Sequence, residues 1–113
     1  MQRATAARLL EQFAGRRALC VGDILYDSFV YGEVRRVSRE APVPILSEIR
    51  RSAMLGGAGN LARNVESLGG QAILVGVVGN DAEGDAVRAL LTSSAPDSAA
   101  GVLTDVSRCT PSK

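Results

Sequence analysis

The sequence predicts an α/β fold in which a mostly parallel sheet carries a small antiparallel pair of strands. Two short, continuous apolar runs, at residues 18–22 and 72–78, are typical of strands buried inside a parallel sheet. Segments with the apolar spacing of helices alternate with these runs, which favours parallel strands joined by helices. Between them, residues 28–50 mix charged side chains with prolines, a pattern tolerated only in exposed or edge strands.

Length and composition limit the classes of protein to consider. The 113 residues allow one domain or part of one, and a net charge of +1 gives no reason to expect nucleic acid or an anionic membrane as partner. Without histidine, this chain holds no Ser-His or Cys-His catalytic pair and no His-ligated metal. Cys20 and Cys109 form no CxxC, as expected of a reduced protein. No apolar run approaches the roughly 18 residues of a membrane span, and we expect a cytoplasmic protein.

The first half of the chain predicts a helix, a strand and the antiparallel pair. The helix has apolar residues at i, i+3, i+4 and i+7, and Gly15 can end it. The strand at 18–22 follows, ending at Gly22 and Asp23. Residues 28–50 then form a partly exposed pair that projects from the main sheet. The apolar positions of the helix are Ala6, Leu9, Leu10 and Phe13.

The second half predicts two helices and two further strands. A glycine cluster at 56–60 opens a helix, and Gly69 and Gly70 end it. After the strand at 72–78, Asp81 is a candidate N-cap for a helix that reaches about Leu91. Residues 93–100 are expected to be a loop, and a strand begins at Val102 and ends near Asp105. The predicted inward positions are Leu61, Val65 and Leu68 in the first helix and Val87, Leu90 and Leu91 in the second.

The glycine cluster is the first candidate site. Gly56 and Gly57 allow a ligand to touch the backbone, and the following helix start presents free N–H groups. Asn60 offers both a donor and an acceptor, which suits sugar hydroxyls. A tight turn that merely begins a helix explains the same residues equally well.

Two further groups of polar residues follow the first strand. Asp23 and Asp27 can each accept hydrogen bonds from two hydroxyls, although a turn cap and a solvated carboxylate are the plainer interpretation. Five arginines could bind a phosphate, although surface arginines more often guard an exposed strand edge. These arginines are Arg35, Arg36, Arg39, Arg50 and Arg51.

Dinucleotide binding is a competing hypothesis. Gly57, Gly59 and Ala62 match a variant of the dinucleotide fingerprint, and Asp81 lies about 20 residues further on. That motif requires a buried strand directly before it, whereas residues 47–53 are charged and typical of an edge. The sequence has no phosphate loop of the G-x-x-x-x-G-K-[ST] type.

The spaced motifs together resemble a known family. Residues 56–62 (GGAGNLA), with Gly69 and Gly79, resemble the first signature of the ribokinase-like carbohydrate kinases. Residues 22–27 (GDILYD) resemble the family's sugar-binding first strand, and 76–84 (GVVGNDAEG) its strand–turn–helix continuation. The resemblance covers roughly residues 17–113.

One branch of that family is most similar. Residues 27–32 (DSFVYG), 37–44 (VSREAPVP) and 110–113 (TPSK) resemble kinases that phosphorylate D-glycero-D-manno-heptose 7-phosphate at C1, in ADP-heptose and lipopolysaccharide core synthesis. Two positions depart from the branch: Arg39 stands where proline is usual, and Gly59 where alanine is usual.

The resemblance implies a fold and a set of roles. The fold would be a three-layer α/β/α arrangement with an antiparallel lid at about 28–50, and the lid strands would pair two copies into a homodimer. Asp27, with Asp23, would bind sugar hydroxyls. Gly56, Gly57 and Asn60 would line the same pocket, and Lys113 would reach a substrate phosphate.

The resemblance also implies that some parts lie outside this chain. Family members carry a second glycine-rich motif that ends in the catalytic aspartate, beside the contacts to ATP and Mg, and the sequence lacks it. We therefore expect residues 1–113 to be the N-terminal part of a sugar kinase domain, without catalytic residues, cofactor or metal of its own, and inactive alone. A non-catalytic sugar-binding or protein-interaction module that uses the lid strands is the alternative.

Overall fold

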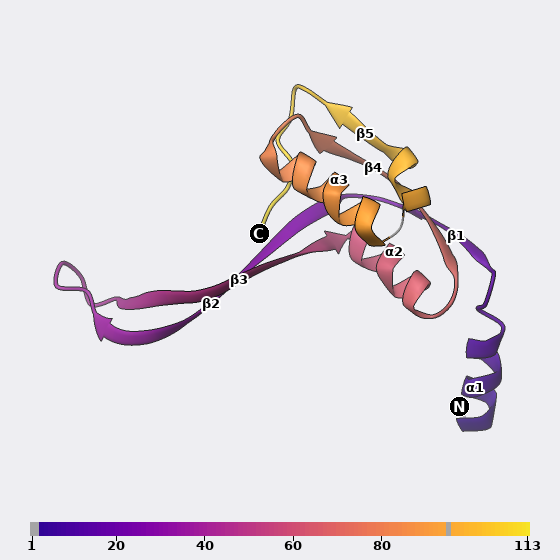
Figure 1. The fold of residues 1–113 in the computed structure, drawn as a ribbon, viewed down its shortest axis with the longest axis horizontal. Coiled ribbons are helices and arrows are strands. Elements are labelled where there is room, and N and C mark those ends of the chain that lie inside the picture. Colours follow the sequence, from indigo (N-terminus) through magenta and orange to yellow (C-terminus); the bar gives the residue numbers. More distant parts are fainter. Residues whose placement is uncertain (1–2, 95) are drawn as a thin grey trace.

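A computed structural model describes residues 3–94 and 96–113, which form a small parallel sheet, a long antiparallel hairpin and three α-helices (Figure 1). In chain order the elements are α1 (Arg3–Glu11), β1 (Arg17–Val21), β2 (Ile24–Val37), β3 (Pro44–Gly57), α2 (Ala58–Ser67), β4 (Gln71–Gly79), α3 (Ala82–Ser94), the 3-10 helix η1 (Pro96–Gly101) and β5 (Val102–Asp105).

The parallel sheet has the strand order β1-β4-β5. β1 pairs with β4 from Arg17↔Gln71 to Val21↔Val75, and β4 pairs with β5 from Gly76↔Val102 onward. Both pairings are parallel, which confirms the prediction drawn from the alternation of apolar runs and helices. β4 is the central strand, and its alternate residues are buried on one face, as a strand period of two requires.

The core lies between one face of this sheet and the helices α2 and α3. Leu74 and Val78 of β4 are fully buried there, together with Val87 and Leu91 of α3. The inward positions predicted for the second of these helices are thereby confirmed, and Leu90 packs against the same cluster. Burial of these branched side chains gives the sheet and its helices a common apolar interior.

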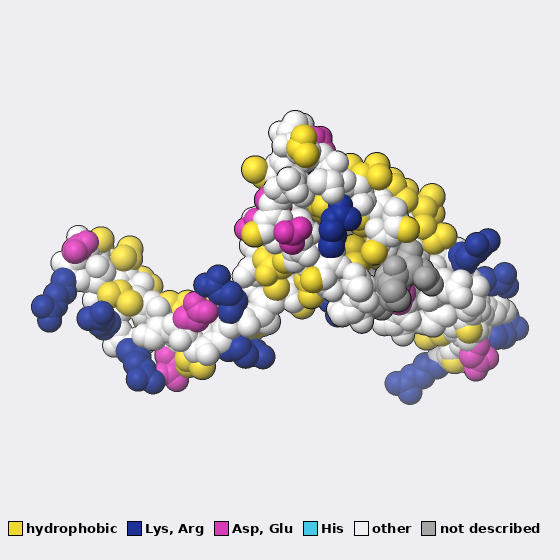
Figure 2. Space-filling view, turned by 45° about the horizontal axis from the view of Figure 1, so that its top comes forward, with side chains coloured by type: hydrophobic (Ala, Val, Ile, Leu, Met, Phe, Trp, Pro, Cys, Tyr) yellow, Lys and Arg dark blue, Asp and Glu magenta, His cyan; other side chains and the backbone are white. Residues whose placement is uncertain are grey.

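The opposite face of the sheet is open, contrary to the prediction that its strands are buried on both sides. Leu19, Val21 and Leu103 are 64%, 66% and 61% exposed, so no described element covers that face. Figure 2 shows hydrophobic side chains along the upper edge of the body. Of the three layers expected, the described residues therefore supply the sheet and one helical layer.

The hairpin β2–β3 is longer than the predicted lid at 28–50. It pairs antiparallel from Ile24↔Gly57 to Val37↔Pro44, with register shifts at Tyr31/Gly32 and Val34/Arg36. Its base lies in the core, where Ile24 and Leu55 are buried, while its far half projects from the body (Figure 1). The radius of gyration of 18.4 Å exceeds the roughly 13 Å of a compact chain of this length, because of this projection and the outlying α1.

Three predicted details differ in the helices. α1 ends before Gly15, as predicted, but none of its described residues is buried. Of the predicted inward positions, Leu61 of α2 and Leu68 just after it are 53% and 44% exposed, whereas Val65 packs against the core as predicted. Gly59 and Ala62 are the buried residues of α2. A Cβ at Gly59 would lie 2.8 Å from the Leu55 Cβ, so the helix approaches β3 through its smallest residues.

The prediction of a loop at 93–100 is also wrong. α3 continues to Ser94 and η1 occupies Pro96–Gly101, while residue 95 lies outside the described residues. Residues 93–100 are rich in serine and alanine, and no helical spacing of large apolar residues there indicates a helix. In the described part of the chain no helix has both the length and the apolarity to cross a membrane.

Candidate functional site

Asp27 stands within β2, opposite Met54 of β3, where the hairpin leaves the body. Its side chain is partly buried, and its Oδ1 atom is shielded from water with no hydrogen-bond partner among the described residues. A shielded carboxylate oxygen without a donor is unfavourable, since it has lost water and gained nothing. The arrangement leaves this oxygen able to accept a hydrogen bond from a ligand hydroxyl.

Gly56 makes room for the Asp27 carboxylate. A Cβ added at Gly56 would lie 2.4 Å from Asp27 Oδ2 and 2.9 Å from its Cγ, so a side chain there would displace the carboxylate. The backbone of β3 therefore lies directly against the carboxylate. Gly56 and Asp27, which the sequence separates by 29 positions, occupy one place in the structure.

Gly57 joins β3 to α2 in a conformation reserved for glycine. Its φ of 56° is left-handed, and a Cβ there would lie 2.3 Å from the backbone oxygen of Asp23. The next N–H, that of Ala58, donates to this same oxygen at 2.8 Å. Gly57 provides no side-chain cap, so later N–H groups in the first turn of α2 remain available to an oxygen of a ligand.

Asp23 and Asn60 are less closely joined to Asp27 than the sequence suggested. Four residues of extended chain separate Asp23 from Asp27, about 13 Å, too far for both to hold one hydroxyl. Both Asp23 and Asn60 are exposed, and no hydrogen bond joins either side chain to Asp27 within the described residues. Asp23 contributes its backbone oxygen to the start of α2, and Asn60 lies in the first turn of that helix.

Lys113 lines the same cavity as Asp27 because the end of the chain pairs with β2. Tyr26 N–H donates to the Pro111 oxygen at 2.9 Å, Lys113 N–H donates to the Tyr26 oxygen at 3.0 Å, and Ser28 N–H donates to the Lys113 oxygen at 2.7 Å. Asp27, Ser28, Phe29 and Lys113 line one cavity of about 180 Å³. A carboxylate and a lysine that line one cavity suit a polyol that carries a phosphate.

Thr110 is a buried residue of this region that sequence reasoning missed. Its hydroxyl donates to Asp81 Oδ1 at 2.6 Å, its N–H donates to Asp81 Oδ2 at 2.7 Å, and it accepts from Gly79 N–H at 2.9 Å. Asp81 Oδ1 also accepts from Gly84 N–H at 2.8 Å, which confirms the predicted N-cap of α3. The link between Asp81 and Thr110 spans 29 residues, so no local pattern could show it.

These hydrogen bonds hold the pKa of the Asp81 carboxyl below its usual range, first through the Thr110 hydroxyl, then through the backbone N–H of Thr110 and of Gly84. A lowered native pKa stabilises the fold above the pKa of the unfolded chain, about 3.9. That stability is lost as pH falls through the lower native value. Unfolding by urea should therefore show the free-energy gap between wild type and Asp81→Asn shrinking as pH falls below about 4. A gap independent of pH would contradict this role for Asp81.

The five candidate arginines lie on the exposed hairpin, where Figure 2 shows basic side chains along its length. Arg35 pairs with Glu33 at 2.6 Å and Arg51 with Glu48 at 3.0 Å. The Arg50 guanidinium lies 4.3 Å from the centre of the Tyr31 ring, a cation–π contact. None of the five lines the cavity of Asp27, although Arg51 lines a neighbouring cavity of about 300 Å³ together with Ser28 and Lys113. For the other four, the geometry favours residues that protect an exposed strand edge over phosphate ligands.

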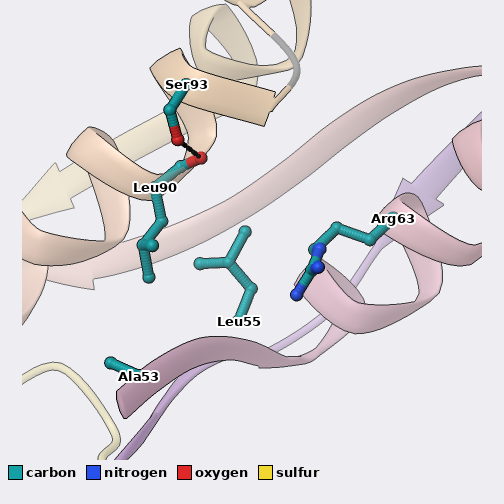
Figure 3. Close-up of a pocket in the computed structure, with 5 residues that line it drawn as sticks. All are labelled: Ala53, Leu55, Arg63, Leu90 and Ser93. Carbon is teal, nitrogen blue, oxygen red and sulfur yellow. Dashed lines mark hydrogen bonds between the residues drawn. The ribbon is translucent and has the colours of Figure 1, made fainter. Parts of the chain in front are cut away.

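A second cavity, of about 160 Å³, lies between β3, α2 and α3. Figure 3 shows Arg63 of α2 and Leu90 and Ser93 of α3 around Leu55, with the Ser93 hydroxyl donating to the Leu90 oxygen at 2.9 Å. No residue singled out from the sequence as a binding residue lines it. Across residues 3–94 and 96–113, no three acidic or cysteine side chains gather as a metal site would need.

The family model and the similar proteins agree on one family. Residues 16–98 match the pfkB family of carbohydrate kinases. The chain is 47% identical over 109 residues to the "Bifunctional protein HldE" of Caulobacter sp. (strain K31), covering 96% of this chain and 22% of that protein. It is 57% identical over 79 residues to the protein of the same name from Gluconacetobacter diazotrophicus, covering 70% of this chain and 16% of that protein.

A solved structure shows the fold. The Arabidopsis thaliana ribokinase, complexed with ribose and ATP, matches with a TM-score of 0.56 and 22% sequence identity, covering 88% of this chain and 31% of that chain. The described elements are thus an N-terminal portion of a ribokinase-like fold. The chain spans about a fifth of the length of the curated relatives it matches. Because the family match covers most of the chain, this protein belongs to the pfkB family of carbohydrate kinases.

Proposed function

We propose that this chain forms the sugar side of the pocket in a kinase that phosphorylates D-glycero-D-manno-heptose 7-phosphate at C1, in ADP-heptose and lipopolysaccharide core synthesis. The observation that carries the proposal is the shielded, unpartnered Oδ1 of Asp27 in the cavity that Lys113 also lines. Sequence similarity to proteins named HldE supports the heptose branch.

In this proposal each candidate residue has a separate task. Asp27 accepts hydrogen bonds from sugar hydroxyls, and Lys113 attracts the 7-phosphate. Gly56 and Gly57 let the sugar approach the backbone, and the absence of a side chain at Gly56 leaves room for the Asp27 carboxylate. Asn60 and Asp23 would act further along the pocket, at the start of α2.

ATP and Mg would be bound by sequence that the relatives have beyond the matched span. The described residues bring together no ligand set for a metal ion. The attack of the sugar hydroxyl on the γ-phosphate would use a base from outside these 113 residues. The protein would work in the cytoplasm, where sugar phosphates and ATP are found together.

Titration calorimetry with D-glycero-D-manno-heptose 7-phosphate, together with an ATP-consumption assay, tests this function on the 113-residue chain. We expect binding of the sugar phosphate and no ATP turnover. Weaker binding of the same heptose without its phosphate would support the task given to Lys113. Absence of binding at millimolar sugar phosphate would overturn the function, and ATP turnover would overturn the expected inactivity of this chain.

The hairpin supports a second proposal, a homodimer formed by its exposed strands. Val34 and Leu46 face each other across the hairpin and are 58% and 48% exposed, and Ile49 nearby is 68% exposed. Apolar side chains gathered on a projecting ribbon favour burial against another ribbon. A module whose only task is to bind another protein through the same strands is the alternative, and failure of the sugar phosphate to bind would favour it.

Sedimentation equilibrium tests the dimer. We expect wild type to associate at micromolar concentration and the double variant Val34→Ser/Leu46→Ser to remain monomeric, because it removes a facing apolar pair. Leu61→Ser, a change at a comparably exposed leucine on α2, is the matched control and should still dimerise. A wild type that stays monomeric, or a control that also dissociates, would contradict a dimer through the hairpin.

A further inference from the structure

The last four residues of the chain form a short extended segment that connects the two sheets. Ser112 makes a parallel bridge with Tyr26 of β2. At its start, Thr110 is bonded to Asp81 and Gly79, at the carboxyl end of β4 and the start of α3. The segment is thus fixed at one end by side-chain bonds and along its length by pairing with β2.

Pairing with β2 decides which way Lys113 faces. In a parallel pair, residues in register point to the same side of the sheet, and successive residues alternate. With Ser112 opposite Tyr26, Lys113 is opposite Asp27. The two residues line the same cavity of about 180 Å³. A segment shifted or released from β2 would remove Lys113 from that cavity.

We propose that Asp81 and Thr110 are positioning residues, which hold the 110–113 segment against β2 and so keep Lys113 facing Asp27. The inference rests on the proposed sugar site for its functional consequence, but not for the existence of the contact. Asp81 suits this task because its two oxygens serve different partners: Oδ2 accepts the Thr110 N–H, while Oδ1 accepts the Gly84 N–H and the Thr110 hydroxyl.

Because the two oxygens of Asp81 have different partners, one substitution can remove the bond to Thr110 N–H and keep the bond to Gly84 N–H. Asparagine caps helices about as well as aspartate, so Asp81→Asn can keep its Oδ1 bond to Gly84 N–H. Its amide nitrogen would then face the Thr110 N–H, and two donors cannot bond. Thr110→Ser keeps the hydroxyl and serves as the conservative control, whereas Thr110→Val keeps the shape of threonine and removes the hydroxyl.

Amide hydrogen exchange, followed by NMR on the full 113-residue chain, reads the segment directly. The N–H groups of Tyr26 and Ser28 donate to oxygens of the segment, so both should exchange at least ten times faster in Asp81→Asn and Thr110→Val. The N–H of Gly22, which donates to Val75 in the main sheet, and that of Gly84 should exchange faster only by what the fall in the free energy of unfolding of each variant, measured in urea, accounts for. Thr110→Ser should match wild type throughout.

Two results would overturn the positioning role. Unchanged protection at Tyr26 and Ser28 in both disrupting variants would show that pairing holds the segment without Asp81 and Thr110. A loss of protection at Gly22 as large as that at Tyr26 and Ser28 would show that these residues stabilise the fold as a whole and do not hold the segment in particular. Should Asp81→Asn fail to fold, the comparison of Thr110→Val with Thr110→Ser makes the same distinction.

Calorimetry with D-glycero-D-manno-heptose 7-phosphate tests the consequence for the site. We expect Asp81→Asn and Lys113→Ala each to weaken binding about ten-fold and the double variant to be no weaker than Lys113→Ala, because one acts through the other. A double variant that loses affinity by the product of the two single losses would contradict the claim that Asp81 acts through Lys113. If wild type does not bind the sugar phosphate, the proposed function fails, while the exchange rates still decide whether Asp81 and Thr110 hold the segment.

Discussion

Asp27→Ala is expected to abolish measurable binding of the sugar phosphate, lowering its affinity by about 100-fold or more. The reason is the Oδ1 atom, which is shielded from water and has no donor within the described residues. A sugar hydroxyl would supply that donor, and hydrogen bonds to a charged group are among the stronger ones. Alanine removes both carboxylate oxygens and leaves the hydroxyls unpaired.

Two further variants separate loss of the acceptor from loss of charge or of the fold. Asp27→Asn has nearly the same shape but one carbonyl oxygen and no charge, and it should bind with intermediate affinity. Asp85→Asn makes the same chemical change at an exposed position of α3 and should bind as wild type does. Binding would be measured by titration calorimetry, and an Asp27→Ala chain that retains wild-type affinity would contradict the assignment of Asp27.

Gly57→Ala should be the most destabilising single methyl addition at the glycine cluster, reducing the free energy of unfolding by roughly 3 kcal/mol or more. Gly57 combines a left-handed φ of 56° with a virtual Cβ 2.3 Å from the Asp23 oxygen. That oxygen cannot simply move away, because it accepts the Ala58 N–H at 2.8 Å. The backbone strain of the left-handed φ and the steric clash of the added Cβ with the Asp23 oxygen therefore both destabilise the variant.

Gly15→Ala is the matched control for that change. Gly15 also has a left-handed φ, of 72°, but an added Cβ meets nothing within 4 Å. Alanine there should reduce the free energy of unfolding by about 1 kcal/mol, the strain alone. Urea denaturation of both variants measures the difference. Equal effects would show that the close approach of Gly57 to Asp23 contributes nothing to the stability of the junction.

Local patterns predicted the elements of the body well. The apolar runs at 18–22 and 72–78 correspond to β1 and β4, and Asp81 caps α3 as its position suggested. These features depend on the spacing of neighbouring residues, which a sequence displays directly. The same patterns failed at burial, since Leu19 and Leu61 are apolar and yet exposed. Which face of a strand or helix is covered depends on distant elements.

Contacts between distant residues could not be predicted from spacing. Asp27 and Gly56 meet because the hairpin folds back along its whole length, and its extent from Ile24 to Gly57 exceeds what charge and proline content indicated. The hydrogen bonds between Asp81 and Thr110 could not be predicted from spacing either, although residues 110–113 resemble the heptose branch. Asp23 and Asn60 remain candidates, and neither side chain is hydrogen-bonded to Asp27 among the described residues.

Chemical-shift mapping of D-glycero-D-manno-heptose 7-phosphate on the isotopically labelled chain tests the central claim most directly. A sugar site at Asp27 predicts saturable shifts at Asp27, Ser28, Phe29 and Lys113, which line one cavity, and at Gly56 and Gly57 beside it. Shifts confined to Arg63 and Ser93, around the second cavity, or no shifts at saturating sugar phosphate, would contradict a sugar site at Asp27.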